Sequence, residues 1–148
     1  MKKTKLLLSL FGLLLLCSAC GDDEERVTYD AQKFVGTWAL HSVQGWKIDP
    51  YTGVRNNWNV TIGNTTDREY REVVFNANGT YVVNSYDADA SMSWGMTENG
   101  TYTTADGSLT TKAADGLLTV SSYQFKGNEL TLTERNPEAD LVTVYRKK

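Results

Sequence analysis

Three short turn signals, each flanked by alternating apolar and polar residues, constrain the fold of this chain most strongly. Residues 76–79 (Asn-Ala-Asn-Gly) suit a three-residue hairpin that ends with Gly79 in the left-handed conformation. Asp106-Gly107 and Gly127-Asn128 suit two-residue hairpins. No stretch after Arg26 shows sustained helical periodicity. The pattern therefore predicts an all-β chain of antiparallel hairpins.

Each predicted hairpin gathers apolar and aromatic side chains on one face. The first turn pairs Phe75 with Tyr81 and Val73 with Val83. The residues predicted to face inward elsewhere are Leu40, Ser42, Tyr102, Thr104, Leu109, Thr111, Tyr123, Phe125, Leu130 and Leu132. Eight tyrosines against only two prolines also favour strands.

Eight strands are expected, joined in an up-and-down order. Their predicted ranges are 36–44, 69–76, 79–86, 98–104, 108–112, 117–126, 128–135 and 140–147. Alternate connections then lie at opposite ends, so the three tight turns close one end and the long connections, including all of 45–68, gather at the other. Closing the sheet gives an eight-stranded antiparallel β-barrel with room for side chains or one small ligand. A ninth strand within 45–68 would break this parity.

The first and last strands of the predicted barrel carry family motifs. Gly36-Thr37-Trp38 resembles the Gly-x-Trp strand that opens lipocalins and fatty-acid-binding proteins. Residues 143–146 (Thr-Val-Tyr-Arg) resemble their closing strand, in which an arginine packs over that tryptophan. Gly79-Thr80-Tyr81 and Gly100-Thr101-Tyr102 resemble repeats in lipocalin-like domains of bacterial lipoproteins. The resemblance, over 34–148, implies a calycin barrel in which Gly36, Trp38 and Arg146 are structural. The chain departs from it in lacking the lipocalin disulfide and any helical-lid pattern in 45–68.

The N-terminus has the pattern of a secretory signal. Three early lysines precede an apolar run over 6–16, which is too short for a membrane span. Residues 17–20 (Cys-Ser-Ala-Cys) resemble the lipobox of bacterial lipoproteins, although Cys17 stands where leucine is usual. This predicts a signal peptide over 1–19 and acylation, with a chain such as palmitate, at Cys20. An ordinary secreted protein cleaved nearby is the alternative.

The next segment, 20–33, is expected to be a lipidated acidic tether. Its run Gly21-Asp22-Asp23-Glu24-Glu25 resembles the surface-export signals of some Gram-negative lipoproteins. The predicted location is the bacterial cell envelope, anchored to the outer membrane, with the surface-facing and periplasm-facing leaflets both open. The strand from Gly36 begins at the tight-turn end, so the loop-rich end is expected to point away from that membrane.

Charge and motifs exclude several classes of function. Without the signal peptide, twelve basic residues face eighteen acidic ones, a net charge of −6 that argues against nucleic-acid binding. Cys20 is then the last cysteine, so no disulfide is expected. No P-loop, GxGxxG, GxSxG or HExxH motif occurs.

His41 alternates away from Trp38 and is expected to face outward, a poor position for a general base; a lone haem or metal ligand is the alternative. Asp87-Ala88-Asp89 lacks further calcium ligands. No catalytic residue, metal or cofactor is expected, and the protein is not expected to be an enzyme.

Aromatic side chains are the candidate ligand contacts. Those predicted at the open end are Trp46, Tyr51, Trp58, Tyr86 and Trp94. Three inward tyrosines, Tyr81, Tyr102 and Tyr123, are candidates for contacting a polar head group. The alternatives are that the rings pack loops onto the barrel and that the hydroxyls bond one another.

These features predict a lipid-anchored, extracytoplasmic protein that binds a small apolar or amphipathic molecule in a barrel cavity. A second hypothesis is a cell-surface module whose barrel interior is filled and whose aromatic loops bind a protein or a glycan.

Overall fold

The computed structural model describes residues 29–65, 67–87 and 93–148. Its elements are α1 (Tyr29–Phe34), β1 (Gly36–Ile48), β2 (Arg55–Thr61), β3 (Arg71–Phe75), β4 (Thr80–Asp87), β5 (Ser93–Ala105), β6 (Ser108–Ala113), β7 (Leu118–Lys126), β8 (Glu129–Asn136) and β9 (Ala139–Lys147). The predicted signal peptide, Cys20, the acidic run at 21–25 and residues 88 and 89 of the segment 87–89 lie outside the described residues.

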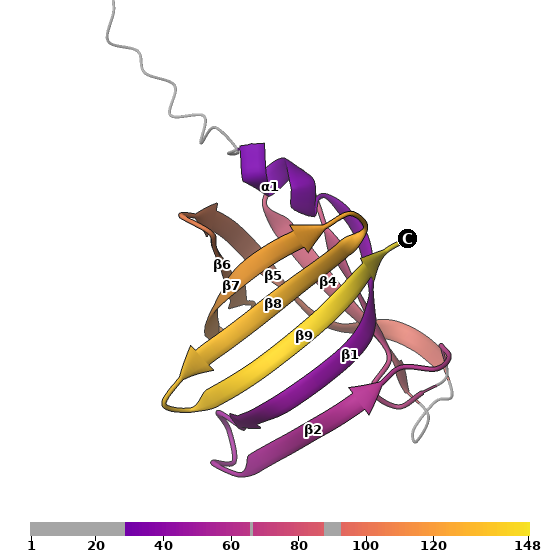
Figure 1. Ribbon diagram of the computed structural model, residues 1–148, viewed down its shortest axis with the longest axis vertical. Helices are drawn as coiled ribbons and strands as arrows, with labels where there is room; N and C mark the ends of the chain where they lie inside the picture. Colours follow the sequence, from indigo (N-terminus) through magenta and orange to yellow (C-terminus); the bar gives the residue numbers. More distant parts are fainter. Residues whose placement is uncertain (1–28, 66, 88–92) are drawn as a thin grey trace, which may run out of the picture.

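Strand β1 closes the sheet by pairing with both β3 and β9 (Figure 1). Strands β1 and β3 to β9 thus form a closed, eight-stranded antiparallel barrel, which confirms the predicted fold. The first hairpin has the predicted register, with Phe75 opposite Tyr81 and Val73 opposite Val83. At the β5–β6 turn, Asp106 and Gly107 have φ values of 50° and 76°, as a type I′ turn requires.

The segment 45–68, predicted as a single loop, contains the end of β1 and all of β2. Strand β1 continues to Ile48, and β2 pairs with residues 42–48 of β1 in an antiparallel register. Because β9 occupies the opposite edge of β1, β2 and β3 lie on the same edge and run in the same direction. The strands after β2 therefore keep the directions predicted for them, despite the extra strand.

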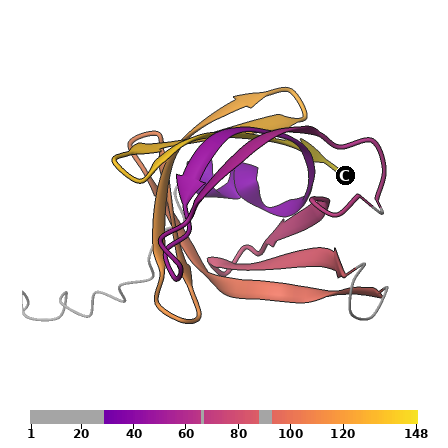
Figure 2. The same cartoon turned by 90° about the horizontal axis from the view of Figure 1, so that it is seen from below.

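One end of the barrel is sealed by α1, a helix that the sequence pattern did not predict (Figure 2). Phe34, at its last turn, is fully buried and packs edge-on against Phe75, Tyr123 and Phe125 at centroid distances of 5.3, 4.9 and 4.9 Å. The Trp38 indole donates a hydrogen bond of 2.6 Å to the Phe34 carbonyl. Residues 29–33, assigned to the tether from sequence, are thus part of the folded unit.

A β-bulge at His41 changes which residues of β1 face the interior. Leu40 pairs with Tyr145 and Ser42 with Val144, so His41 is the extra residue. Leu40 and Val43 are consequently both buried, whereas Ser42, predicted to be inward, is only half-buried. Alternation from Val43 then carries Lys47 to the inner face.

The predicted contact between Trp38 and Arg146 is wrong. Tyr145 is buried, and alternation along β9 therefore turns Arg146 outward, where its guanidinium lies 3.2 Å from Glu129. Lys147 is the residue whose ammonium lies over the Trp38 ring, 5.2 Å from its centroid.

Candidate functional site

The half of the barrel away from α1 contains a cavity of about 280 Å³. Apolar side chains line it toward the sealed end, and hydroxyl and charged groups are set among them. Its lining residues are Val43, Lys47, Trp58, Arg71, Val73, Phe75, Tyr81, Val83, Glu98, Leu109, Thr111, Thr119, Ser121, Leu132, Glu134, Leu141, Thr143 and Tyr145.

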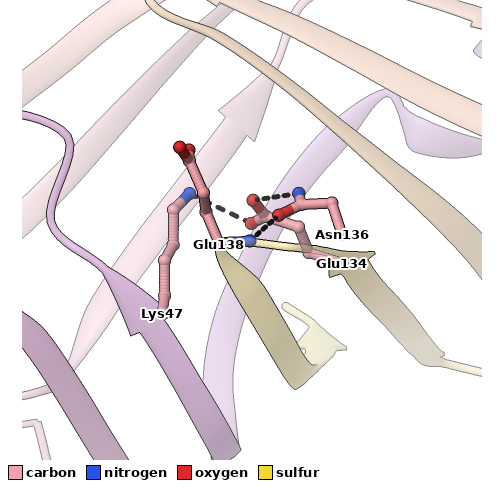
Figure 3. A network of polar contacts seen from close by, with 4 residues as sticks. All are labelled: Lys47, Glu134, Asn136 and Glu138. Atoms are coloured by element: carbon pink, nitrogen blue, oxygen red, sulfur yellow. Dashed lines mark hydrogen bonds and ion pairs between the residues drawn. The ribbon is translucent and has the colours of Figure 1, made fainter.

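An ion pair spans the cavity wall near the β8–β9 turn (Figure 3). Lys47 of β1 lies 3.0 Å from Glu134 of β8, and their side chains are 26% and 11% exposed. Asn136 donates to the other carboxylate oxygen of Glu134 at 3.3 Å, and its own side-chain oxygen accepts from the Glu138 backbone at 2.8 Å. Both charges of the pair are therefore compensated within the protein.

A tyrosine and a glutamate from neighbouring strands form a second polar contact. The Tyr81 hydroxyl donates to the Glu98 carboxylate. Burial, and then this carboxylate, raise the pKa of Tyr81, so its hydroxyl stays protonated at neutral pH.

Two further polar groups line the cavity without such partners. Within the described part of the chain, the Arg71 guanidinium makes no hydrogen bond and no ion pair. Burial raises the pKa of Tyr145, the positive charge of Arg71 opposes this shift, and Glu98 adds to it. The Arg71 charge is thus close enough to act on the Tyr145 hydroxyl.

Comparison with known families supplies an independent assignment. The model of the lipocalin-like domain family matches residues 34–145. This chain belongs to that family. A lipocalin-like barrel is a fold suited to holding a hydrophobic ligand in its interior.

A similar chain among the solved structures is the fatty-acid-binding protein 1 of Echinococcus granulosus. It is 16% identical with a TM-score of 0.43, and the match covers 78% of this chain and 98% of that chain. The search of curated proteins gave no match.

Of the aromatic residues predicted to bind ligand, Trp58 and Tyr81 line the cavity of this lipocalin-like barrel. Tyr102 and Tyr123 lie toward the sealed end, where their hydroxyls donate to the Asn76 carbonyl at 2.9 Å and to Asp30 at 3.1 Å. Those two hydroxyls are satisfied by the protein itself. Their role in ligand binding stays a prediction.

The other predicted contacts lie outside the cavity lining. Arg55 lies over Trp46, 4.1 Å from the ring centroid. The Tyr51 ring is 70% exposed, and its hydroxyl donates to Asp115 in the β6–β7 turn. Trp94 is 42% exposed and packs against Tyr70 and Tyr86, a group that lies on the outer wall. Ligand contact by Trp46, Tyr51, Tyr86 and Trp94 stays a prediction.

The charged groups of the cavity were missed by sequence reasoning. Glu134 lies two residues from Leu132 on β8, and Arg71 lies two residues from Val73 on β3. Because side chains two positions apart in a strand face the same side, alternation alone predicts that both charged groups face the interior. This alternation was not used, because only aromatic side chains were considered as ligand contacts. Lys47 was hidden by the bulge at His41.

Among the described residues no group of histidine, cysteine, aspartate and glutamate side chains is arranged to hold a metal ion. In that same part of the chain, no helix has the length and apolar character that crossing a membrane requires.

Proposed function

We propose that this lipocalin-like protein is an extracytoplasmic binding protein that holds a small amphipathic molecule inside its barrel. The cavity of about 280 Å³ carries the proposal, because it lies near the lower end of the ~300–1,000 Å³ typical of ligand pockets. The cavity wall is apolar toward the end sealed by α1 and polar toward the opposite end, which is called the mouth below. This arrangement suits a molecule with an apolar part and a polar part. Binding of this kind needs no covalent chemistry.

The rival function, surface recognition by a filled barrel, has less support. The interior is filled only at the end sealed by Phe34 and Trp38, both almost inaccessible to solvent. The other half is hollow and carries side chains with unused hydrogen-bonding capacity. A barrel that only holds binding loops in place does not need a cavity lined by polar side chains.

The cavity proposal is tested by blocking the interior from one strand. Thr119 lines the cavity, whereas the neighbouring Val120 is 56% exposed on the outer face of β7. We expect protein purified from its natural host to retain a small molecule in native mass spectrometry. The Thr119→Trp variant is expected to lose it and the matched Val120→Trp variant to keep it. Equal retention by both variants, or no bound molecule in any of them, contradicts the proposal.

Anchoring at Cys20 is the second part of the proposal. It is supported by the lysine-rich start, the apolar run and the lipobox-like cysteine. The Cys20→Ser variant is expected to fractionate as soluble, unacylated protein with an unchanged fold. Retention of that variant in the membrane contradicts the anchor.

The orientation follows from the place where the chain joins the barrel. Eight residues separate Cys20 from α1, a reach of at most ~28 Å, and α1 covers the sealed end. The cavity mouth is thus expected to face away from the anchoring membrane. A label at Gln32→Cys should be quenched by spin-labelled lipids more strongly than one at Tyr51→Cys. The reverse order contradicts an outward-facing mouth.

A further inference from the structure

We infer that a second site, on the outer wall of the barrel, binds the pyranose ring of a neutral saccharide. The site is a hollow of about 450 Å³, lined by Thr65, Glu72, Asn84, Trp94, Gly95 and Lys148. None of these described residues also lines the cavity inside the barrel. The inference therefore goes beyond the proposed function and does not depend on it.

Strand alternation separates the hollow from the cavity. In β3, Glu72 stands between Arg71 and Val73, which both line the cavity, so its side chain faces outward. In β4, Asn84 follows Val83 of the cavity wall and lies directly opposite Glu72. Glu72 and Asn84 are thus cross-strand neighbours on the outer face, close enough for both to contact one small molecule.

Trp94 provides an apolar surface of fixed orientation. Its ring packs edge-on against Tyr70 at a centroid distance of 5.1 Å and lies 6.0 Å from the Tyr86 ring. Tyr70 is only 5% exposed and so holds this group in place, whereas Trp94 itself is 42% exposed. A tryptophan that is fixed by its neighbours, with much of its surface in water, is suited to stacking against the apolar face of a ligand ring.

Glu72 provides a charged hydrogen-bond acceptor. One of its carboxylate oxygens accepts from the Tyr70 hydroxyl and from the Lys148 ammonium, each at 2.7 Å. Within the described part of the chain the other oxygen accepts no hydrogen bond. No fully buried side-chain oxygen among the described residues lacks a partner, so this second oxygen is accessible from the hollow. It is suited to accepting hydrogen bonds from the hydroxyls of a ligand.

The same contacts keep Glu72 ionised. Burial raises the pKa of its carboxyl, but the hydrogen bonds from Lys148 and Tyr70 outweigh burial and hold the pKa below its ordinary value. The acceptor is therefore charged at neutral pH.

Asn84 provides a donor and a second acceptor. The residue is half-buried, and among the residues that the structure describes its side-chain amide makes no hydrogen bond. An amide both donates and accepts, as a sugar hydroxyl does, so the two groups can bond in either direction.

The charges of the hollow favour a neutral ligand. Glu72 and Lys148 form an ion pair of 2.7 Å, so their charges cancel. An anion would be repelled by Glu72 and a cation by Lys148. A pyranose is uncharged and carries hydroxyls around its edge for Glu72 and Asn84. When those hydroxyls are equatorial, its faces present C–H groups to Trp94.

The volume of the hollow suits a sugar ring. At ~30 Å³ per water, 450 Å³ corresponds to about fifteen waters, which is room for one hexose of about twelve non-hydrogen atoms and part of a second. The hollow is open to solvent, so a longer saccharide can extend beyond it.

Heteronuclear NMR of the folded protein tests the inference through the indole N–H signal of Trp94. Cellobiose has neutral pyranose rings with equatorial hydroxyls, sorbitol has hydroxyls but no ring, and adenosine has a flat aromatic ring. Each is titrated to about 10 mM, well above a dissociation constant of ~1 mM. We expect cellobiose to shift the Trp94 signal saturably and to leave that of the buried Trp38 unchanged. Sorbitol should cause no shift, and adenosine a smaller one than cellobiose.

Two polar variants assign the binding to residues. Asn84→Ala is expected to weaken cellobiose binding about threefold to tenfold without changing the melting temperature, because the amide has no partner within the described protein. Glu72→Gln should weaken it about tenfold. The matched control is Glu129→Gln, since that carboxylate pairs with Arg146 away from the hollow, and it should keep wild-type affinity.

An aromatic variant tests the stacking surface. Trp94→Ala, followed through the backbone amide signal of Gly95, is expected to abolish cellobiose binding. Tyr51→Ala removes another exposed aromatic ring, 70% accessible and outside the hollow, and should bind as the wild type does. Thermal melting of each variant checks that it is folded.

The contrary outcomes are distinct from those of the cavity proposal. No shift of the Trp94 signal with cellobiose, or an equal shift with sorbitol, overturns the site. A larger shift with adenosine overturns the saccharide assignment in favour of a planar aromatic ligand. Cellobiose binding that survives both Asn84→Ala and Glu72→Gln also overturns it. Each of these results leaves the cavity proposal standing, because Thr119→Trp tests that proposal separately.

Discussion

Replacing Phe34 by alanine should unseat the helix that seals the barrel. The Phe34 side chain has no exposed surface and makes three edge-on ring contacts at 4.9 to 5.3 Å. Truncating a fully buried phenylalanine costs about 3–5 kcal/mol, and each aromatic pair contributes about 0.5–1.5 kcal/mol beyond area burial. We therefore expect the free energy of unfolding to fall by about 4 kcal/mol, a large part of the ~5–15 kcal/mol of a typical domain.

Urea unfolding followed by tryptophan fluorescence measures the effect. With a slope of about 2 kcal/mol per M, a loss of 4 kcal/mol lowers the midpoint by about 2 M. The matched control is Gln32→Ala, two residues earlier on the exposed face of α1, which should change stability by no more than about 0.5 kcal/mol. If Phe34→Ala shifts the midpoint no further than Gln32→Ala does, α1 is not a structural part of the barrel and the reasoning fails.

Three further variants test the wall and the mouth of the barrel. Gly100→Ala would place a Cβ 2.1 Å from a backbone oxygen of β6, so it should lower stability by about 1–3 kcal/mol in urea unfolding, while Gly95→Ala, with open space around it, should not. Glu134→Gln should destabilise the protein by about 1–3 kcal/mol because it leaves Lys47 partly buried without its anion; adding Lys47→Met should recover most of that loss, and additive losses would show that the pair is not coupled. Burial, followed by the hydrogen bond to a carboxylate, raises the pKa of Tyr70 from 10.0 to about 12, so its contribution to stability is complete below pH 10 and disappears as the pH rises toward 12. Tyr70→Phe should flatten that alkaline decline, and an unchanged pH profile would contradict this assignment.

The sequence predicted the hairpins because their determinants are local. The turn at 76–79, with its φ-positive Gly79, and the alternation on either side of it fix both register and face. The same reasoning failed for β2, where three asparagines in seven residues obscure the alternation and pairing depends on the distant residues of β1. It failed for α1 because six residues are too few for a helical period, and this helix is held by the tertiary contacts of Phe34.

The candidate site was predicted less completely than the fold. Trp58 and Tyr81 were identified, but the charged lining was not, because only aromatic side chains were considered as ligand contacts. Arg71 and Glu134 occupy regular inward positions of β3 and β8. The outward turn of Arg146 also follows from simple alternation, once Tyr145 rather than Arg146 is assigned to the core.

The polar character of the cavity depends on one irregularity in β1. Had the alternation of Trp38 and Leu40 continued without a bulge, Ser42, Gln44 and Trp46 would face inward and Lys47 would face solvent. Glu134 would then lie in the wall with no cation opposite it, a costly arrangement at 11% exposure. The extra residue at His41 turns Lys47 inward instead, and the resulting ion pair neutralises Glu134. Within the described cavity wall, Arg71 and Glu98 are then the two charged side chains without an ion-pair partner.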